Sequence, residues 1–142
     1  MIYADTNILL SLFCPDVLTA AAVAWYQKID DPVCISPWTV MEFRSNIGVR
    51  VRKALLPRAK GLAATRLFDS ASKAHFHVLA PTPAHFDQAG EWLAKPECAL
   101  RSGDALHLAI AFGYGCRQFA TFDKPLGAAA RKLRLPVLLL KA

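Results

Sequence analysis

Four acidic residues stand at positions that suit metal-dependent chemistry on a phosphate. The chain holds only eleven Asp and Glu residues in 142, and each of the four follows an apolar run or lies near the start of a helical pattern. They are Asp5, Glu42, Asp104 and Asp123. Carboxylate oxygens suit Mg²⁺ or Mn²⁺ better than zinc or copper. Because such a cation activates water and stabilises charge on a phosphate, the set predicts phosphodiester hydrolysis with one or two bound ions.

Each of these acids also has a purely structural interpretation. Asp5 and Asp123 would cap helices, and Asp104 would suit a helix N-terminus because it meets the positive end of the helix dipole. Glu42 is different, since it lies beyond the capping turn and shares a helix face with Asn46. Clustered carboxylates repel one another and lose hydration, and a hard divalent cation removes that penalty. Four acids together therefore favour a metal site over four separate caps.

Short polar residues flank the acids. Thr6 and Asn7 directly follow the first acid, and Thr121 lies two residues before the fourth. They would either orient the carboxylates or hydrogen-bond to helix caps and strand ends, and the sequence leaves both roles open. His107 lies one helical turn after the third acid, among Ala and Leu residues, so we expect it to be packed rather than catalytic.

Apolar runs and helical patterns alternate along the whole chain. We expect strands at residues 1–4, 33–35, 77–79, 118–121 and 137–140. We expect helices at residues 8–13, 20–28, 58–73, 83–94, 102–114 and 126–133. A further helix starts at Pro37 with Ser36 as its N-cap, and Ser102 is the expected cap of the helix that it opens. Strands separated by helices imply a three-layer α/β/α domain with a parallel sheet of four to five strands.

This topology brings the four acids to one place. In a parallel α/β sheet the strand C-termini and the helix N-termini share one edge, where such folds bind ligands. Asp5 ends the first expected strand and Asp123 follows the fourth. Glu42 lies about a turn and a half into the helix after the second strand, and Asp104 lies in the first turn of the helix before the fourth. We therefore expect all four side chains on the same edge.

Length and composition favour one globular domain over residues 1–142. The 54% hydrophobic content and the positive mean hydropathy argue against disorder, and the chain is long enough to bury a core without disulfides. No apolar stretch approaches the ~20 residues of a transmembrane helix, and Asp5 interrupts the N-terminus before a secretory signal could form. We expect a soluble cytoplasmic protein that has no membrane partner.

Positive charge is concentrated in one segment. Between Phe43 and Phe68 the chain carries seven basic residues and no acid, so the remainder of the chain sums to −1. The seven are Arg44, Arg50, Arg52, Lys53, Arg58, Lys60 and Arg66. Such a run is either a solvated helical face or a binding surface for a polyanion or an acidic partner, and the acid cluster elsewhere in the chain favours the second interpretation.

Four segments together form a recognisable pattern. The opening segment reads Ile-Tyr-Ala-Asp-Thr-Asn-Ile-Leu-Leu, and the second runs from Ser36 through Glu42 to Phe43. The third reads Asp-Ala-Leu-His-Leu-Ala-Ile-Ala from Asp104, and the fourth reads Ala-Thr-Phe-Asp and ends at Asp123. In order and spacing they resemble PIN-domain nucleases along the whole chain. The length is close to that of the VapC-type toxins of bacterial and archaeal toxin–antitoxin pairs.

The resemblance implies a Mg²⁺-dependent endoribonuclease, in which Mn²⁺ can replace Mg²⁺. It implies a homodimer and a cognate antitoxin, which in this family commonly lies along the toxin and blocks its site. Acidic stretches of such a partner would suit the seven basic residues here. The residues that the resemblance assigns to the metal site are Asp5, Glu42, Asp104 and Asp123.

Two other classes of protein are the alternatives. A Mg²⁺-dependent phosphatase of the haloacid dehalogenase type carries a second Asp two residues after the first, where this chain has Asn7. A response-regulator receiver needs an adjacent acidic pair near its start, which is absent. A silent PIN domain that only binds RNA or protein gains nothing from four clustered acids. Transfer, ribosomal and messenger RNA all remain open as substrates, because RNA recognition depends on surface shape and loops.

Overall fold

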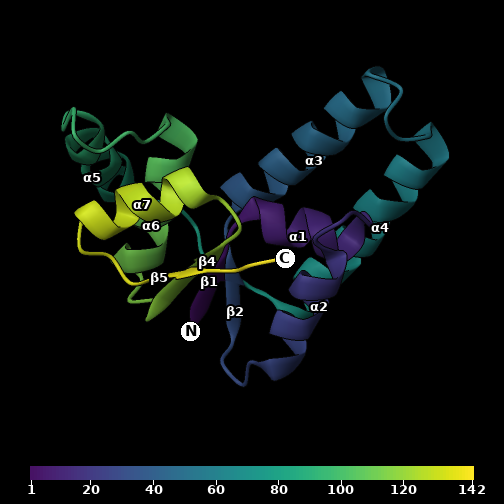
Figure 1. The fold of residues 1–142 in the computed structure, drawn as a ribbon, viewed down its shortest axis with the longest axis horizontal. Helices are drawn as coiled ribbons and strands as arrows, with labels where there is room; N and C mark the ends of the chain where they lie inside the picture. Colours follow the sequence, from purple (N-terminus) through teal and green to yellow (C-terminus); the bar gives the residue numbers. More distant parts are fainter.

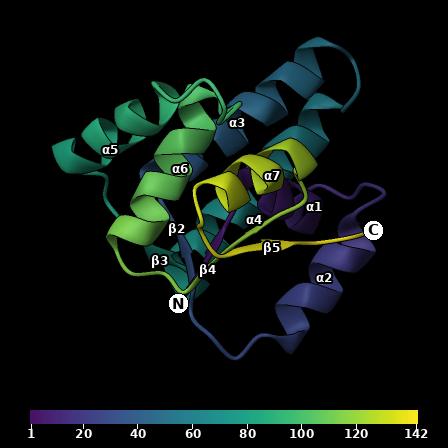
Figure 2. The same ribbon diagram turned by 60° about the vertical axis from the view of Figure 1, so that its left-hand side comes forward.

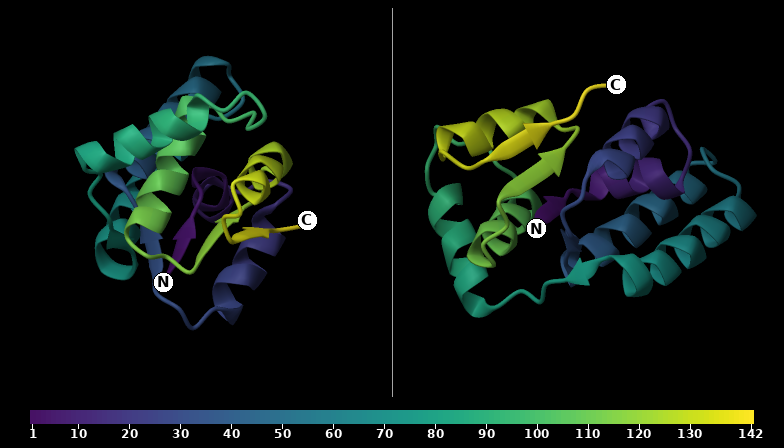
Figure 3. Two further views of the ribbon diagram at one scale, coloured as in Figure 1. Left: turned by 90° about the vertical axis from the view of Figure 1, so that its left-hand side faces the viewer. Right: turned by 90° about the horizontal axis from the view of Figure 1, so that it is seen from below.

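A parallel sheet forms the middle of three layers in a computed structural model that describes all residues, 1–142 (Figures 1 and 3). Its strand order is β3-β2-β1-β4-β5, and every pairing is parallel. The strands are β1 (Ile2–Ala4), β2 (Val33–Ile35), β3 (His77–Val78), β4 (Gln118–Thr121) and β5 (Val137–Leu139). The predicted three-layer α/β/α class is confirmed, with five strands.

Seven helices cover the two faces of the sheet (Figure 3). One face carries α1 (Thr6–Phe13), α2 (Thr19–Lys28), α3 (Pro37–Arg52) and α4 (Arg58–His75). The other carries α5 (Pro83–Leu93), α6 (Ser102–Gly113) and α7 (Lys124–Lys132). Every expected helix is present, and α1 and α7 each begin two residues earlier than expected, directly after an acid that occupies the N-cap position. No helix is long and apolar enough to span a bilayer.

The sheet separates two apolar cores, because successive strand residues point to opposite faces. Ile2 and Ala4 belong to the core beneath α1–α4, whereas Tyr3 between them belongs to the core beneath α6 and α7. Tyr3 stacks on Phe119 of β4 with a centroid distance of 5.5 Å and is fully buried. This alternation fixes the register of β1, and therefore fixes where Asp5 leaves the sheet.

A side chain caps the start of α3, whereas none caps the start of α6. Ser36 caps α3 as expected, with its hydroxyl accepting the amide of Thr39, and Pro37 takes the first helical position. At α6 the expectation was wrong: Arg101 is the N-cap residue, Ser102 is already helical, and no side chain caps the helix. The first turn of α6 therefore keeps its amide groups free of side-chain partners on the edge where Asp104 stands.

A helical hairpin made of α3 and α4 projects beyond the sheet (Figures 1 and 2). Its inner face is anchored by the stacked rings of Phe43 and Phe68, whose centroids are 4.1 Å apart. On the opposite side of the molecule α5 and α6 lie side by side (Figure 2). The sheet edge where β1 and β4 end lies between these two helical units.

Candidate active site

The four predicted acids come from four different elements. Asp5 lies at the N-cap of α1 after β1, and Asp123 lies at the N-cap of α7 after β4. Glu42 is the sixth residue of α3, and Asp104 is the third residue of α6. Since β1 and β4 are adjacent and parallel, their two carboxylates leave the sheet at the same edge.

Asp104 is partly buried, and two of the other acids act on its charge. Its pKa is raised to about 6, first by burial and then by the negative charges of Asp5 and Asp123. Its carboxylate accepts no hydrogen bond from the protein. A carboxylate that is partly desolvated, close to two others and without donors holds a proton until the pH approaches neutral, unless a cation replaces that proton.

Asp5 is held through one of its two oxygens. Oδ2 accepts hydrogen bonds from the Thr121 hydroxyl at 2.5 Å and from the Asn7 side-chain amide at 2.7 Å. Asn7 also donates to Thr121 Oγ1 at 3.0 Å, and its Oδ1 accepts the amide of Phe122 at 3.2 Å. The Asp5 side chain makes no helix-capping bond, so the capping interpretation does not apply. Burial raises its pKa, against the opposing effects of the His107 charge and the Thr121 hydrogen bond.

Glu42 is also held through one oxygen. Oε2 lies 2.7 Å from the donating Thr6 hydroxyl and 2.5 Å from His107 Nε2. Burial alone would raise the pKa of Glu42, but the hydrogen bond and charge of His107, together with the Thr6 hydrogen bond, bring it below its usual value. The other oxygen, Oε1, faces the start of α6, where a Cβ added to Gly103 would lie 3.2 Å away. Oε1 accepts no hydrogen bond.

Asp123 follows the same pattern and also acts as a cap. Its Oδ1 accepts the amide of Leu126, and its own amide donates to Thr121 Oγ1, both at 2.9 Å. The capping interpretation of Asp123 is therefore right as far as one oxygen is concerned. Its Oδ2 has no partner, so each of the four carboxylates keeps at least one oxygen free.

The donor set fits a hard divalent cation in its chemistry. Free carboxylate oxygens are the ligands that Mg²⁺ and Mn²⁺ prefer, and Mg²⁺ keeps several waters, so a few carboxylates suffice. The raised pKa of Asp104 indicates the electrostatic strain that a cation would relieve. As they stand, no three His, Cys, Asp or Glu side chains are close enough together to coordinate one ion.

His107 is packed, as expected, but it is also a polar contact of the cluster. Its ring is 1% exposed and bridges Tyr3, whose phenol oxygen lies 2.9 Å from Nδ1, to Glu42. The sequence pattern predicts no such role for Tyr3. The available signal was the position of His107 one turn after Asp104, on the same face of the helix.

The seven basic residues lie along the α3–α4 hairpin, and all but Arg50 are exposed. Two of them have partners within the chain: Arg44 pairs with Asp69 at 3.0 Å, just outside the acid-free segment, and Arg50 donates to Cys14 Sγ at 3.6 Å. The other five make no salt bridge. Most of the predicted basic surface is therefore free to meet an anionic partner.

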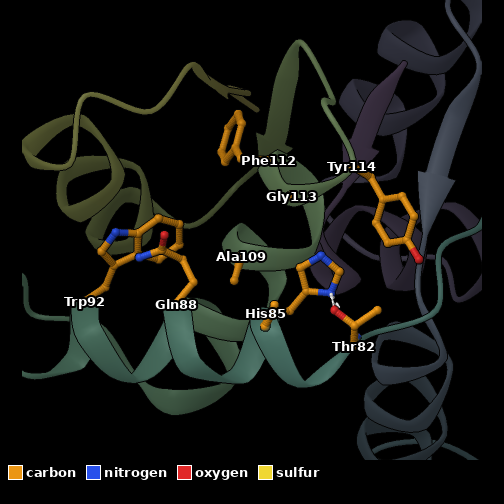
Figure 4. A pocket seen from close by; sticks show the side chains of 9 residues that line it. Thr82, His85, Gln88, Trp92, Ala109, Phe112, Gly113 and Tyr114 are labelled. Atoms are coloured by element: carbon orange, nitrogen blue, oxygen red, sulfur yellow. Dashed lines mark hydrogen bonds between the residues drawn. The ribbon is translucent and has the colours of Figure 1, made fainter.

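A cavity of about 550 Å³ lies away from the acids, between α5 and the end of α6 (Figure 4). His85, Trp92 and Phe112 are among its lining residues, and His85 Nδ1 accepts the amide of Thr82 at 2.9 Å. Gly113 permits this arrangement, because a Cβ there would collide with the His85 ring. None of the predicted site residues lines it.

Comparison with known proteins shows which family and which solved structures the chain resembles. A family model described as the PIN domain matches residues 2–132. No curated protein matches the chain in a sequence comparison.

Solved structures share the fold at low sequence identity. VapC20 of Mycobacterium tuberculosis, described as a toxin that cleaves the sarcin-ricin loop, is 22% identical with a TM-score of 0.71, over 91% of this chain and 95% of that one. FitAcB from Neisseria gonorrhoeae is 21% identical with a TM-score of 0.66, over 97% and 96%. VapBC-1 from nontypeable Haemophilus influenzae is 18% identical with a TM-score of 0.67, over 98% of both chains. At these identities the likeness shows the fold.

Proposed function

The chain belongs to the PIN-domain family, and from that premise we propose that it is a divalent-metal-dependent endoribonuclease and the toxin of a VapBC-type toxin–antitoxin pair. Residues 1–142 form one nuclease domain in this proposal. The acids Asp5, Glu42, Asp104 and Asp123 form the metal site, with Mg²⁺ as the cofactor and Mn²⁺ as a replacement. Relatives named VapC20 and VapBC-1 support the assignment to toxins.

One observation carries the proposal more than any other. The partly buried Asp104 carboxylate accepts no hydrogen bond from the protein, and burial and the charges of Asp5 and Asp123 raise its pKa. A domain that only bound RNA would gain nothing from this repulsion, whereas a metal site uses it. Carboxylates with shifted pKa values at the ligand-binding edge of a sheet are typical of functional sites.

The cation and the residues of the chain have separate roles in the proposed reaction. When bound, a divalent cation supplies Lewis acidity that activates water and offsets charge on the phosphate. Asp5 and Glu42 each have one oxygen fixed by protein donors, so their free oxygens keep a constant direction. The positive charge of the α3–α4 hairpin attracts the phosphate groups of the RNA backbone. Thr6, Asn7 and Thr121 fix the carboxylates rather than touch the RNA.

A cleft beside the α3–α4 hairpin is suited to bind a segment of an antitoxin. A cavity of about 480 Å³ lies between the end of α1 and the α3–α4 turn, with Lys60 in its lining. Leu55 and Leu67, which also line it, are 73% and 58% exposed. An antitoxin segment that combines apolar and acidic residues would cover this cleft and the surrounding basic charge. Leu67→Glu should abolish inhibition by the product of an adjacent small reading frame while leaving RNA cleavage intact.

A second copy of the chain would cover an apolar face next to the acids. Phe86 and Leu93 on α5 are 56% and 39% exposed and border a cavity of about 240 Å³ that Trp38 also lines. We infer that this face is the homodimer interface. Phe86→Asp should then shift the molecular mass in light scattering from dimer to monomer, and an unchanged mass would contradict the inference.

RNA cleavage by the purified chain separates the proposed reaction from its alternatives. Total cellular RNA is incubated with the chain and Mg²⁺ or Mn²⁺, with EDTA as the control, and p-nitrophenyl phosphate is tested in parallel. Discrete fragments that require the cation support the nuclease. A gel shift without fragments would support a binding domain, and hydrolysis of p-nitrophenyl phosphate alone would support a phosphatase.

A further inference from the structure

A buried chain of hydrogen bonds lies behind Glu42. Tyr3 is fully buried, and its hydroxyl contacts three side chains: Ser36 Oγ at 2.7 Å, Thr39 Oγ1 at 3.0 Å and His107 Nδ1 at 2.9 Å. His107 continues the chain to Glu42 Oε2. All of these groups except Glu42 are at most 1% exposed, so water does not compete for their hydrogen bonds.

This network joins the three elements that bear the neighbouring acids. Tyr3 lies two residues before Asp5 on β1, and His107 lies three residues after Asp104 on α6. Thr39 lies three residues before Glu42 on α3. A contact placed within one turn of each acid fixes the relative positions of β1, α3 and α6 at the level of the site.

Polar contacts hold both nitrogens of the His107 ring. On one side, the Tyr3 hydroxyl donates to Ser36 Oγ, and its oxygen lies within hydrogen-bond distance of His107 Nδ1. On the other side of the ring, Glu42 Oε2 already accepts the Thr6 hydroxyl. His107 Nε2 lies 2.5 Å from Oε2 and 3.3 Å from Thr6 Oγ1, so the ring and Thr6 hold the same carboxylate oxygen.

Ring packing restricts His107 further. Tyr3, Trp38 and Phe119 surround it at centroid distances of 5.6, 6.5 and 6.4 Å. The imidazole therefore cannot turn away from Glu42 without disturbing the core. Because the ring is held in place, it also holds Glu42 Oε2. The other oxygen, Oε1, then points to the start of α6, beside Gly103.

We propose that Tyr3 and His107 are positioning residues that lock Glu42 Oε2 and thereby aim Oε1 at the cation site. The metal-site part rests on the proposed function, whereas the locking of Glu42 does not. Neither residue touches the RNA or the cation. Partners that orient a ligand in this way typically change metal affinity by about 10–100-fold when removed.

The test uses three variants of the full chain. His107→Leu fills the core space and removes both contacts, His107→Gln keeps a donor toward Glu42, and Tyr3→Phe keeps the stack on Phe119 but removes the hydroxyl. Two readouts are measured: Mn²⁺ affinity by electron paramagnetic resonance of the free ion, and the Glu42 side-chain conformation in crystal structures of the metal-free variants.

The other buried histidine provides a matched control. His85 is 8% exposed and lines the α5–α6 cavity (Figure 4), whose lining includes none of the four acids. His85→Leu makes the same chemical change as His107→Leu. It should leave both the Mn²⁺ affinity and the Glu42 conformation unchanged, even if it lowers the thermal stability.

The expected results differ among the variants. His107→Leu should turn the Glu42 carboxylate and weaken Mn²⁺ binding about 10–100-fold, and His107→Gln should recover most of that affinity. Tyr3→Phe should show a smaller decrease and decides the question if His107→Leu does not fold. An unmoved Glu42 in both His107→Leu and Tyr3→Phe, or an equal decrease of affinity in His85→Leu, would overturn the proposal. If the wild-type chain binds no Mn²⁺, the proposed function fails, and the metal-free structures still decide whether Glu42 is locked.

Discussion

Asp104 differs from the other three acids because the protein supplies it with no hydrogen-bond donor. Asp5, Glu42 and Asp123 each have one oxygen occupied, whereas the Asp104 carboxylate depends on water or on a cation for both of its oxygens. Its raised pKa follows from burial and from the charges of its neighbours. In the absence of metal, the ionised form of this residue therefore destabilises the fold.

Asp104→Asn should stabilise the metal-free protein at neutral pH. The folded pKa of about 6 exceeds the unfolded value of 3.8, so the folded state binds more protons between these values. The free energy of unfolding of the wild type therefore falls as the pH rises from about 4 to 6. We expect the variant to gain about 1–2 kcal/mol at pH 7, after allowance for partial exposure, and nothing at pH 4.

Urea unfolding at both pH values, with EDTA present, measures this difference. Asp87→Asn is the matched control, because Asp87 is exposed on α5 and lies outside the cluster. A gain at pH 7 that persists unchanged at pH 4 would contradict the electrostatic explanation.

At this scale the sequence predicts only those contacts that join residues adjacent in the chain. Asp5, Thr6 and Asn7 are consecutive, so their proximity to one another needs no tertiary information. The contact between Tyr3 and His107 joins residues 104 positions apart, and it depends on the register of β1 against α6. A single sequence does not contain that register, so the contact of His107 with Tyr3 could not be predicted.

The start of α6 sets the space around Glu42. Gly103 is the second residue of this helix, and a Cβ there would lie 3.1 Å from Trp38 Cζ2 and 3.2 Å from Glu42 Oε1. The glycine therefore lets α3 and α6 approach one another at the site. The expected cap at Ser102 was wrong by one residue, since helix ends depend on backbone angles that composition specifies weakly.

Gly103→Ala should lower metal-dependent RNA cleavage about tenfold with little change in stability, since better helix propensity offsets the crowding. Initial cleavage rates and thermal melts measure the two effects. Gly48→Ala in α3 is the control, because its Cβ would meet only the movable end of Arg52. That control should gain about 0.5–1 kcal/mol and keep its activity. Equal activity in the two variants would show that Glu42 tolerates the added methyl group.

At the scale of the whole molecule, the four acids belong to one edge of the sheet and the seven basic residues lie on the α3–α4 hairpin, which we call the arm. The α3–α4 hairpin (Figure 1) carries the acid-free basic segment, and Glu42 is the sixth residue of α3. The sequence predicted that the basic residues lie on a pair of helices, because the spacing of the apolar residues in this segment indicates helices. The pairing of Arg44 with Asp69 could not be read in the same way, since it depends on how α3 packs on α4.

Reversing charge on the arm should weaken RNA binding in a salt-dependent way. For Arg52→Glu combined with Lys53→Glu, the slope of log affinity against log salt should fall by about one for each phosphate that the arm no longer binds. Binding is measured in EDTA, so that cleavage does not intervene. Arg131→Glu combined with Lys132→Glu on α7 makes the same charge change outside the arm. If both double variants reduce the slope equally, net charge rather than the arm would be responsible.

Metal-dependent RNA cleavage by acid variants tests the central claim most directly. Wild type, Asp5→Asn, Asp104→Asn and Asp87→Asn are compared on total RNA with Mn²⁺ and with EDTA, after circular dichroism confirms that each is folded. We predict discrete fragments for the wild type and Asp87→Asn in Mn²⁺ alone, and a decrease of at least about 10²-fold in the two cluster variants. Cleavage that persists in folded Asp5→Asn or Asp104→Asn, or in EDTA, would contradict the assignment of this edge as the metal-dependent active site.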